Sequence, residues 1–174
     1  TPTVNLYANA GKGFETPTFV EQAYDTVPTP TGRNANLKPS KSKNYEVGAK
    51  AFLGDNVLMN LALFKVLTEN EIVVDQSSGG ISSYKNAGDT ERSGLELSLD
   101  GSFAHNIKGY VSYTYLDAEF SDSFGSVSSG NKIPGAYKER AYTELSWKHP
   151  ETGFFTALEG IYSSKTFVND TNTA

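Results

Sequence analysis

The sequence reads SKNYEVGAKAFL over residues 42–53, and its side chains alternate in character. One parity is apolar, as at Val47 and Leu53, and the other is polar, as at Glu46 and Lys50. A repeat of two places successive side chains on opposite faces of a β-strand. At about 3.3 Å per residue the strand reaches roughly 40 Å, about twice an ordinary globular strand and enough to cross a tilted bilayer.

The same alternation recurs along the chain. The pattern is cleanest at residues 91–100, where three leucines share one parity, and weakest at residues 57–74, where both parities are partly apolar. The remaining alternating segments are residues 4–10, 107–116, 141–148 and 154–162. Together with residues 42–53 they predict about seven long strands.

The connections between these segments fall into two classes. Three are short and contain Gly, Asp, Asn or Pro, which is typical of hairpin turns; they are residues 53–57, 100–107 and 149–153. Three are long and rich in Ser, Gly, Pro, Thr and Asn; they are residues 11–41, 76–83 and 119–138. In an antiparallel up-and-down meander the two classes lie at opposite ends of the strands, the arrangement of outer-membrane barrels. A soluble all-β meander stays open as the alternative.

Composition and charge argue against several kinds of site and partner. Hydrophobic residues make up 37% of the chain and the mean hydropathy is −0.42, with no run of about 20 apolar residues that would predict a membrane-spanning helix. A barrel strand escapes this test because alternate residues face water. Cysteine is absent, which excludes disulfides and thiolate metal sites. The net charge of −5 without a basic stripe argues against a nucleic-acid partner, and no grouping of side chains predicts a catalytic site.

Aromatic residues are frequent on the apolar parity. In a membrane barrel they would form an interfacial girdle, and in a soluble protein they would belong to a sandwich core. The candidates are Tyr113, Tyr115, Trp147, Phe154 and Tyr162.

Five strings carry a family resemblance. They are NLYANAGKGFETPT (5–18), NLKPSKSKNYEVG (36–48), YKNAG (84–88) followed by GLE (94–96), KIPGAY (132–137) and FVNDTNT (167–173). They resemble the C-terminal part of the barrel of TonB-dependent outer-membrane receptors, and the last two are similar to the siderophore-receptor branch. The resemblance implies that residues 1–174 are part of a 22-stranded transmembrane β-barrel whose plug domain, TonB box and last strands lie outside this sequence. Since the sequence does not begin with Met, we expect an internal piece or a processed product.

The resemblance also implies a function and partners. It predicts a receptor of the bacterial outer membrane for TonB-dependent active uptake of a ferric siderophore or similar iron chelate. The expected partners are the chelate, TonB acting through the N-terminal region, and outer-membrane lipid. Residues 1–174 alone should not transport, and their open strand edges should favour self-association or closure into a smaller sheet. A haem or cobalamin receptor barrel and a soluble structural or adhesive β-module are the alternatives.

Site residues follow from the loops and the polar parities. The long loops offer aromatic and cationic candidates for ligand contact, namely Tyr24, Arg33, Tyr137 and Arg140. The polar parities offer charged candidates for lining the lumen, namely Glu46, Lys50, Arg92, Glu96, Glu144, Lys148 and Glu159. Gly48 and Gly94 are expected to leave room for a neighbouring backbone or a plug. Iron would arrive already chelated, so neither a cofactor nor a protein metal site is predicted. His105 and His149 are interpreted as surface residues of the short turns.

Overall fold

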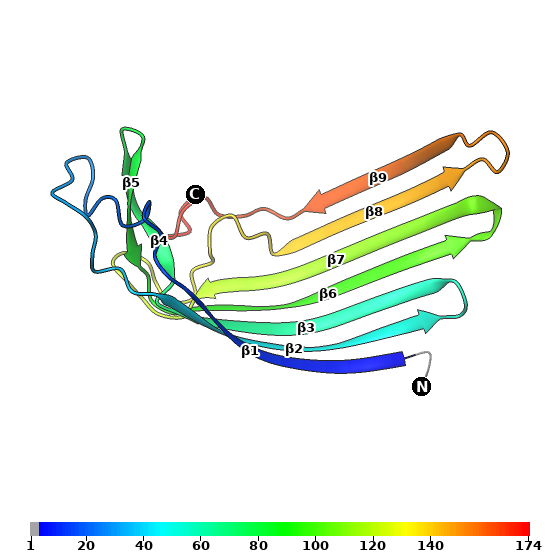
Figure 1. The fold of residues 1–174 in the computed structure, drawn as a ribbon, viewed down its shortest axis with the longest axis horizontal. Helices are drawn as coiled ribbons and strands as arrows, with labels where there is room; N and C mark the ends of the chain where they lie inside the picture. Colours follow the sequence, from blue (N-terminus) through cyan, green and yellow to red (C-terminus); the bar gives the residue numbers. More distant parts are fainter. Residues whose placement is uncertain (1–3) are drawn as a thin grey trace.

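A single long antiparallel sheet dominates the computed structural model, which describes residues 4–174 (Figure 1). Its seven strands pair in the order β1-β2-β3-β6-β7-β8-β9. Their bounds are β1 (Val4–Glu15), β2 (Ser40–Leu53), β3 (Val57–Glu69), β6 (Thr90–Phe103), β7 (Ile107–Phe120), β8 (Glu139–Lys148) and β9 (Phe155–Ser163). The all-β meander of seven long strands is therefore confirmed. The described residues contain no helix long and apolar enough to cross a membrane.

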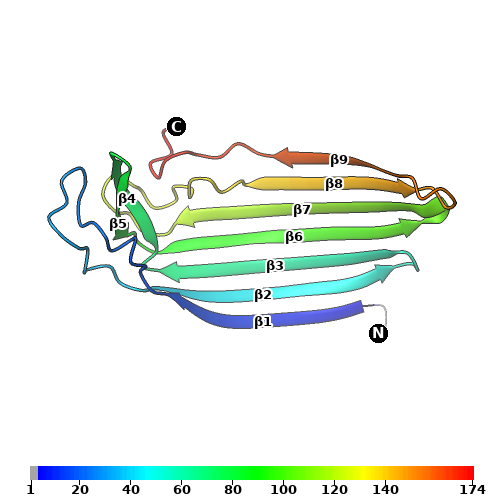
Figure 2. The same ribbon diagram turned by 45° about the horizontal axis from the view of Figure 1, so that its top comes forward.

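The two classes of connection lie at opposite ends of the sheet, as predicted (Figure 2). At the turn end, tight reversals depend on residues in left-handed backbone conformations, including Gly54 (φ 64°), Gly153 (φ 72°) and Asn106 (φ 58°). His105 also has a positive φ of 62° and belongs to the short 3₁₀ turn η1 (Ala104–Asn106). The long loops and the C-terminus lie together at the other end, called here the loop end.

The first strand is longer than the predicted residues 4–10. β1 continues to Glu15, with Gly11 opposite Asn44 and Gly13 opposite Ser42. Glycine weakens a strand in isolation, but here β2 supplies a continuous ladder of partners. The stretch that sequence reasoning assigned to a loop is therefore wall.

The prediction of one strand over residues 57–74 and a loop over 76–83 is wrong. β3 ends at Glu69 because Asn70 adopts a φ of 57° and turns the chain. A separate two-stranded hairpin follows, formed by β4 (Ile72–Ser78) and β5 (Ile81–Asn86). Gly79 and Gly80, with φ of 61° and 82°, form its tip, as the favoured hairpin turns with positive φ require.

The sheet has one apolar and one polar face. Directly opposed residues share a face, so the register extends the alternation of residues 42–53 across all seven strands. One row of the apolar face consists of Leu6, Ala49, Leu61, Leu97, Tyr113, Ala141 and Tyr162. The neighbouring row of the polar face consists of Tyr7, Gly48, Ala62, Glu96, Thr114, Arg140 and Ser163. The predicted parities are thus confirmed.

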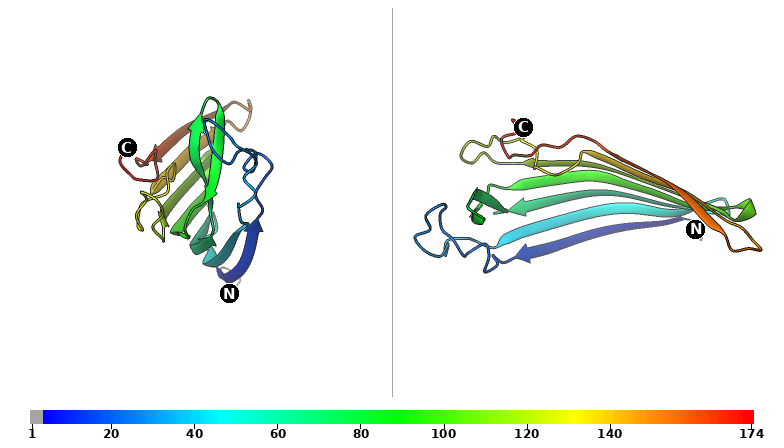
Figure 3. Two further views of the ribbon diagram at one scale, coloured as in Figure 1. Left: turned by 90° about the vertical axis from the view of Figure 1, so that its left-hand side faces the viewer. Right: turned by 90° about the horizontal axis from the view of Figure 1, so that it is seen from above.

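The apolar face is uncovered. Leu6 is 81% exposed, Leu158 74% and Val111 44%. Along β7 the apolar band runs from Ile107 to Tyr115, about 26 Å at 3.3 Å per residue, close to the height of a lipid-facing band. Figure 3 shows the sheet as a twisted arc that stays open, with β1 and β9 at its edges. An apolar surface of this extent is a lipid or protein interface rather than a water-facing one.

The aromatic candidates lie on this apolar face. Tyr115 lies at the loop-end limit of the band, and Trp147 lies near the turn end with its ring centroid 6.4 Å from that of Phe154. Within residues 4–174 no second sheet packs against the face, so these rings do not form a sandwich core. Their role in an interfacial girdle stays a prediction.

Groups of the neighbouring strands occupy the room at Gly48 and Gly94. A Cβ at Gly48 would lie 2.4 Å from the ring of Tyr7, and one at Gly94 would lie 2.3 Å from the Tyr115 carbonyl oxygen and 2.7 Å from the ring of Phe64. Aromatic rings of adjacent strands already cover both glycines, a pairing that protects glycine backbone in sheets. The expected approach of a neighbouring backbone is confirmed at Gly94, and the approach of a plug stays a prediction.

A small apolar cluster holds the loop end together. Ala87, Phe120 and Val127 are buried, and Phe120 is only 1% exposed. Phe124 packs edge-on against Phe120 with ring centroids 5.1 Å apart. Val73 and Ile133 complete the cluster, which joins the β4–β5 hairpin, the end of β7 and the loop of residues 121–138.

Candidate functional site

All seven charged residues predicted to line the lumen lie on the polar face. They are Glu46, Lys50, Arg92, Glu96, Glu144, Lys148 and Glu159. The register places Glu144 directly opposite Glu159, and the Tyr142 hydroxyl donates a hydrogen bond of 3.0 Å to Glu144. The face carries both signs of charge, which suits a polar interior. Because the sheet is open, lining of a closed lumen stays a prediction.

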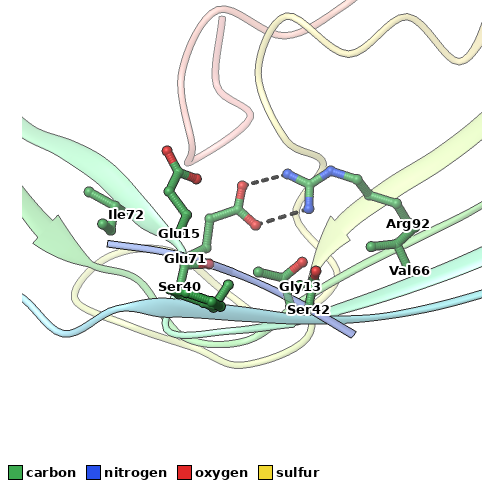
Figure 4. A pocket seen from close by; sticks show the side chains of 10 residues that line it. Gly13, Glu15, Ser40, Ser42, Val66, Glu71, Ile72 and Arg92 are labelled. Atoms are coloured by element: carbon green, nitrogen blue, oxygen red, sulfur yellow. Dashed lines mark hydrogen bonds and ion pairs between the residues drawn. The ribbon is translucent and has the colours of Figure 1, made fainter. Parts of the chain in front are cut away.

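A cavity of about 430 Å³ lies where the polar face meets the loop end. Most of its wall consists of small hydroxyl-bearing, glycine or charged residues. The lining residues are Gly13, Phe14, Glu15, Ser40, Ser42, Val66, Thr68, Glu71, Ile72 and Arg92. Figure 4 shows Glu71 and Arg92 pointing toward each other within it.

Glu71 and Arg92 form a bidentate ion pair. Arg92 Nη2 lies 2.5 Å from Glu71 Oε1, and Arg92 Nη1 donates to Glu71 Oε2 at 2.9 Å. The Thr90 hydroxyl donates to the same carboxylate and accepts from Arg92 Nη1 at 3.0 Å. The Arg92 and Glu71 side chains are 27% and 22% exposed, so the pair is partly desolvated. An arginine and a carboxylate joined by two hydrogen bonds form a rigid pair. The pair has little net charge but can offer hydrogen bonds to a ligand.

The backbone around Asn70 sets the position of Glu71. Asn86 Nδ2 donates to the Asn70 carbonyl at 2.9 Å, and the Ala87 amide donates to the Glu71 carbonyl at 2.7 Å. Asn86 also exchanges hydrogen bonds with the backbone of Lys38, at 2.8 and 2.9 Å. One side chain therefore ties the first long loop, the hairpin and the cavity together.

Acidification should loosen this corner. Burial acts to raise the pKa of the Glu71 carboxyl, but the bonds from Arg92 and Thr90 outweigh it and hold that pKa below its ordinary value of 4.5. The stabilisation is present above about pH 4.5 and is lost as the pH falls through the lower folded-state pKa. In the full-length protein we expect hydrogen exchange of β4 and β5 to accelerate over this acidic range, measured by mass spectrometry.

Glu71→Gln provides the control for this pH effect. The variant should exchange faster at neutral pH and lose the acid-induced change in β4 and β5, because the titrating group is gone. An identical acid response in the variant would contradict the assignment to Glu71.

The four ligand-contact candidates are not brought together. Tyr24 is half-buried and Arg33 exposed in the first long loop, while Tyr137 is 42% exposed just before β8. Arg140 is the second residue of β8 and lies on the polar face opposite Thr114. Within residues 4–174 none of the four lines the cavity at Arg92. Their contact with a ligand stays a prediction.

Sequence reasoning identified Arg92 but missed its partner Glu71. A continuous strand over residues 57–74 would put Glu71 at the parity of Leu61, on the face opposite to that of Arg92. The preceding Asn70 was the available signal, because asparagine is one of the few residues that tolerate the left-handed conformation and so can end a strand. The hydroxyls of Ser40, Ser42 and Thr68 gave no signal, since they belong to the ordinary polar parity of β2 and β3.

Comparison with known proteins identifies the family of the chain. Residues 1–174 match the family model "TonB dependent receptor-like, beta-barrel". The metal-pseudopaline receptor CntO of Pseudomonas aeruginosa is 30% identical over 120 residues, covering 68% of this chain and 15% of CntO. The vitamin B12 transporter BtuB of Photobacterium profundum is 30% identical over 128 residues, covering 68% of this chain and 19% of BtuB.

A solved structure shows the same fold. The ferric yersiniabactin uptake receptor FyuA of Yersinia pestis superposes with a TM-score of 0.74 at 21% identity, covering 99% of this chain and 25% of FyuA. The chain thus spans a quarter of this structure and less than a fifth of the two curated relatives. Since the family match extends over every residue, the chain belongs to the β-barrel family of TonB-dependent receptors of the bacterial outer membrane.

Proposed function

We propose that this chain forms part of the wall of a receptor that takes up a ferric siderophore or similar iron chelate by TonB-dependent active transport. The observation that carries the proposal is the pairing of an uncovered apolar face with a polar face that ends in an ordered cavity at the loop end. The family is one of receptors and transporters. CntO is named as a metal-pseudopaline receptor and FyuA as a ferric yersiniabactin uptake receptor, which supports a metal chelate as cargo.

The proposal places ligand contact at the loop end of the wall. Arg92 and the hydroxyls of Ser40, Ser42 and Thr68 offer hydrogen-bond donors to the oxygen atoms of a chelate. TonB would act through an N-terminal region and a plug outside residues 1–174. The seven-stranded arc alone encloses no channel, so transport belongs to the full-length protein.

Uptake of iron chelates tests the function. A strain that lacks the gene should fail to accumulate radioactive iron from one class of ferric chelate, and the full-length gene should restore uptake in a TonB-dependent manner. Restored uptake of cobalamin or haem, with no iron chelate accepted, would replace the proposed cargo. If no cargo depended on either the gene or TonB, the transport function would be wrong.

Arg92→Ala should weaken binding of that chelate about tenfold or more, because a hydrogen bond to a charged group contributes about 1.5–3 kcal/mol. Lys108→Ala is the matched control, since Lys108 lies on the same face at the turn end. Affinity would be measured by quenching of intrinsic fluorescence in the purified receptor. Equal affinities of the two variants would exclude the cavity as a contact site.

A further inference from the structure

The wall of the cavity at Arg92 contains more negative than positive charge. Within residues 4–174 the charged lining residues are two carboxylates, Glu15 and Glu71, and one cation, Arg92. Figure 4 shows the Glu15 side chain on the same side of the sheet as the Glu71–Arg92 pair. Because the pair is neutral as a whole, the negative charge of Glu15 is left over.

The positive charge of Arg92 is already matched within the wall. Its two terminal nitrogens bond to the Glu71 carboxylate at 2.5 and 2.9 Å, and Nη1 also donates to the Thr90 hydroxyl at 3.0 Å. An arginine in such a pair can still donate hydrogen bonds through its remaining N–H groups. An anionic ligand would therefore find donors at Arg92 but little net attraction between charges.

The charge of Glu15 has no such match. Glu15 is the last residue of β1 and lies opposite Ser40 on the polar face, where its side chain is exposed. It forms no ion pair with any residue of 4–174. A ligand that fills the cavity would come within reach of this carboxylate.

The lysines nearest in the register cannot supply the missing cation. Lys12 lies three residues before Glu15, so its side chain is on the opposite face of β1. Lys43 and Lys41 pair with Lys12 and Phe14, and they therefore share the apolar face with Lys12. The sheet itself separates all three lysines from the polar face at the cavity.

We propose that the cavity selects iron chelates that have an ammonium group and no net negative charge. The ammonium group would pair with the Glu15 carboxylate, while Arg92 and the hydroxyls of Ser40, Ser42 and Thr68 bond to oxygen atoms of the chelate. A chelate with several negative charges would be repelled by Glu15. This inference rests on the uptake function proposed above and narrows its cargo.

Two chelates that differ only in one charge test the inference. The first is the ferric complex of desferrioxamine B, a linear trihydroxamate with a free ammonium group, and the second is the complex of its N-acetyl derivative. Affinity for the purified full-length receptor is measured by fluorescence quenching. The ammonium form should bind about fivefold more tightly, as expected for one ion pair at an exposed site, and added salt should reduce this difference. Ferric enterobactin, a tricatecholate with three negative charges, should bind most weakly.

Variants assign the preference to Glu15. Glu15→Gln should abolish the preference for the ammonium form and leave the affinity for the acetylated form unchanged. Glu15→Lys should reverse the preference, because it replaces the negative charge by a positive one. Glu69→Gln is the matched control, since it removes the same charge at the loop end but on the apolar face, opposite Lys41. The control variant should keep the preference of the unaltered receptor.

The possible results separate this inference from the proposed function. Equal affinities for the two trihydroxamates, as a cation supplied by another part of the full-length chain would cause, overturn the inference, and so does a preference that survives Glu15→Gln. Binding of the tricatecholate alone would support the uptake function but contradict the inference. If none of the three binds, the chelate identified by the uptake assay decides, because a net negative charge on it overturns the inference. If the gene restores uptake of no iron chelate, the proposed function fails and the inference fails with it.

Discussion

Arginine at position 111 is expected to destabilise the full-length protein in a bilayer by about 2–4 kcal/mol, the cost of a cation on the lipid face near the bilayer midplane. Val111 is 44% exposed and belongs to a middle row of the apolar band. The uncovered face leaves a longer side chain free to extend away from the sheet. The cost would therefore come from lipid, and urea unfolding in phosphatidylcholine vesicles measures it.

The neighbouring position supplies the control. Ser112 lies on the polar face of the same strand, between Ser98 and Tyr142. Ser112→Arg should cost much less than Val111→Arg, because its side chain points away from lipid. Equal stability of the two variants in vesicles would contradict the assignment of faces and favour a water-exposed sheet.

Phe120→Ala is expected to open the loop end locally, at a cost of about 3–5 kcal/mol for a buried phenylalanine. Phe120 is 1% exposed and packs against Phe124, Ala87 and Val127. Hydrogen-exchange protection of residues 72–86 and 121–138 should fall by about a hundredfold or more, since about 1.4 kcal/mol corresponds to a factor of ten.

Two comparisons make the result on Phe120 specific. Protection should not change where β6 and β7 pair near the turn end, because Phe120 pairs with Thr90 at the opposite end of their ladder. Phe19→Ala should have no effect on either region, as Phe19 is 90% exposed. Loss of protection throughout the sheet would mean that the cluster supports the wall itself rather than the loop end.

The long strands of the sheet could be predicted because each shows its alternation within its own short stretch of sequence. Alternation places Val47 and Leu53 on one face whatever the partner strand is, and the pairing of neighbours along the chain then fixes the register. The hairpin β4–β5 was not predicted, because serines flank Gly79-Gly80 and made the stretch look like a loop. Its strands become ordered partly through Val73 and Ala87, which contact a loop far away in sequence.

The site was predictable only in part. The parity of Arg92 follows from its strand, but its bond to Glu71 depends on the turn at Asn70 and on Asn86 holding that turn. These are tertiary contacts that no periodicity contains. The loop candidates Tyr24, Arg33 and Tyr137 rested on residue type alone, and residue type does not say where a loop folds.

The ladder between β3 and β6 makes the pairing of these strands independent of the length of their connection. Thr68 pairs with Thr90, so the register of the wall is the same as if the chain between them were a short turn. Lengthening such a connection costs only about 0.6 kcal/mol for each doubling of its length. The excursion that contains Glu71 and the β4–β5 hairpin can thus be exchanged, shortened or duplicated while the wall keeps its register. The chemistry of the cavity wall at Glu71 can therefore change while the strands beside the cavity keep their pairing.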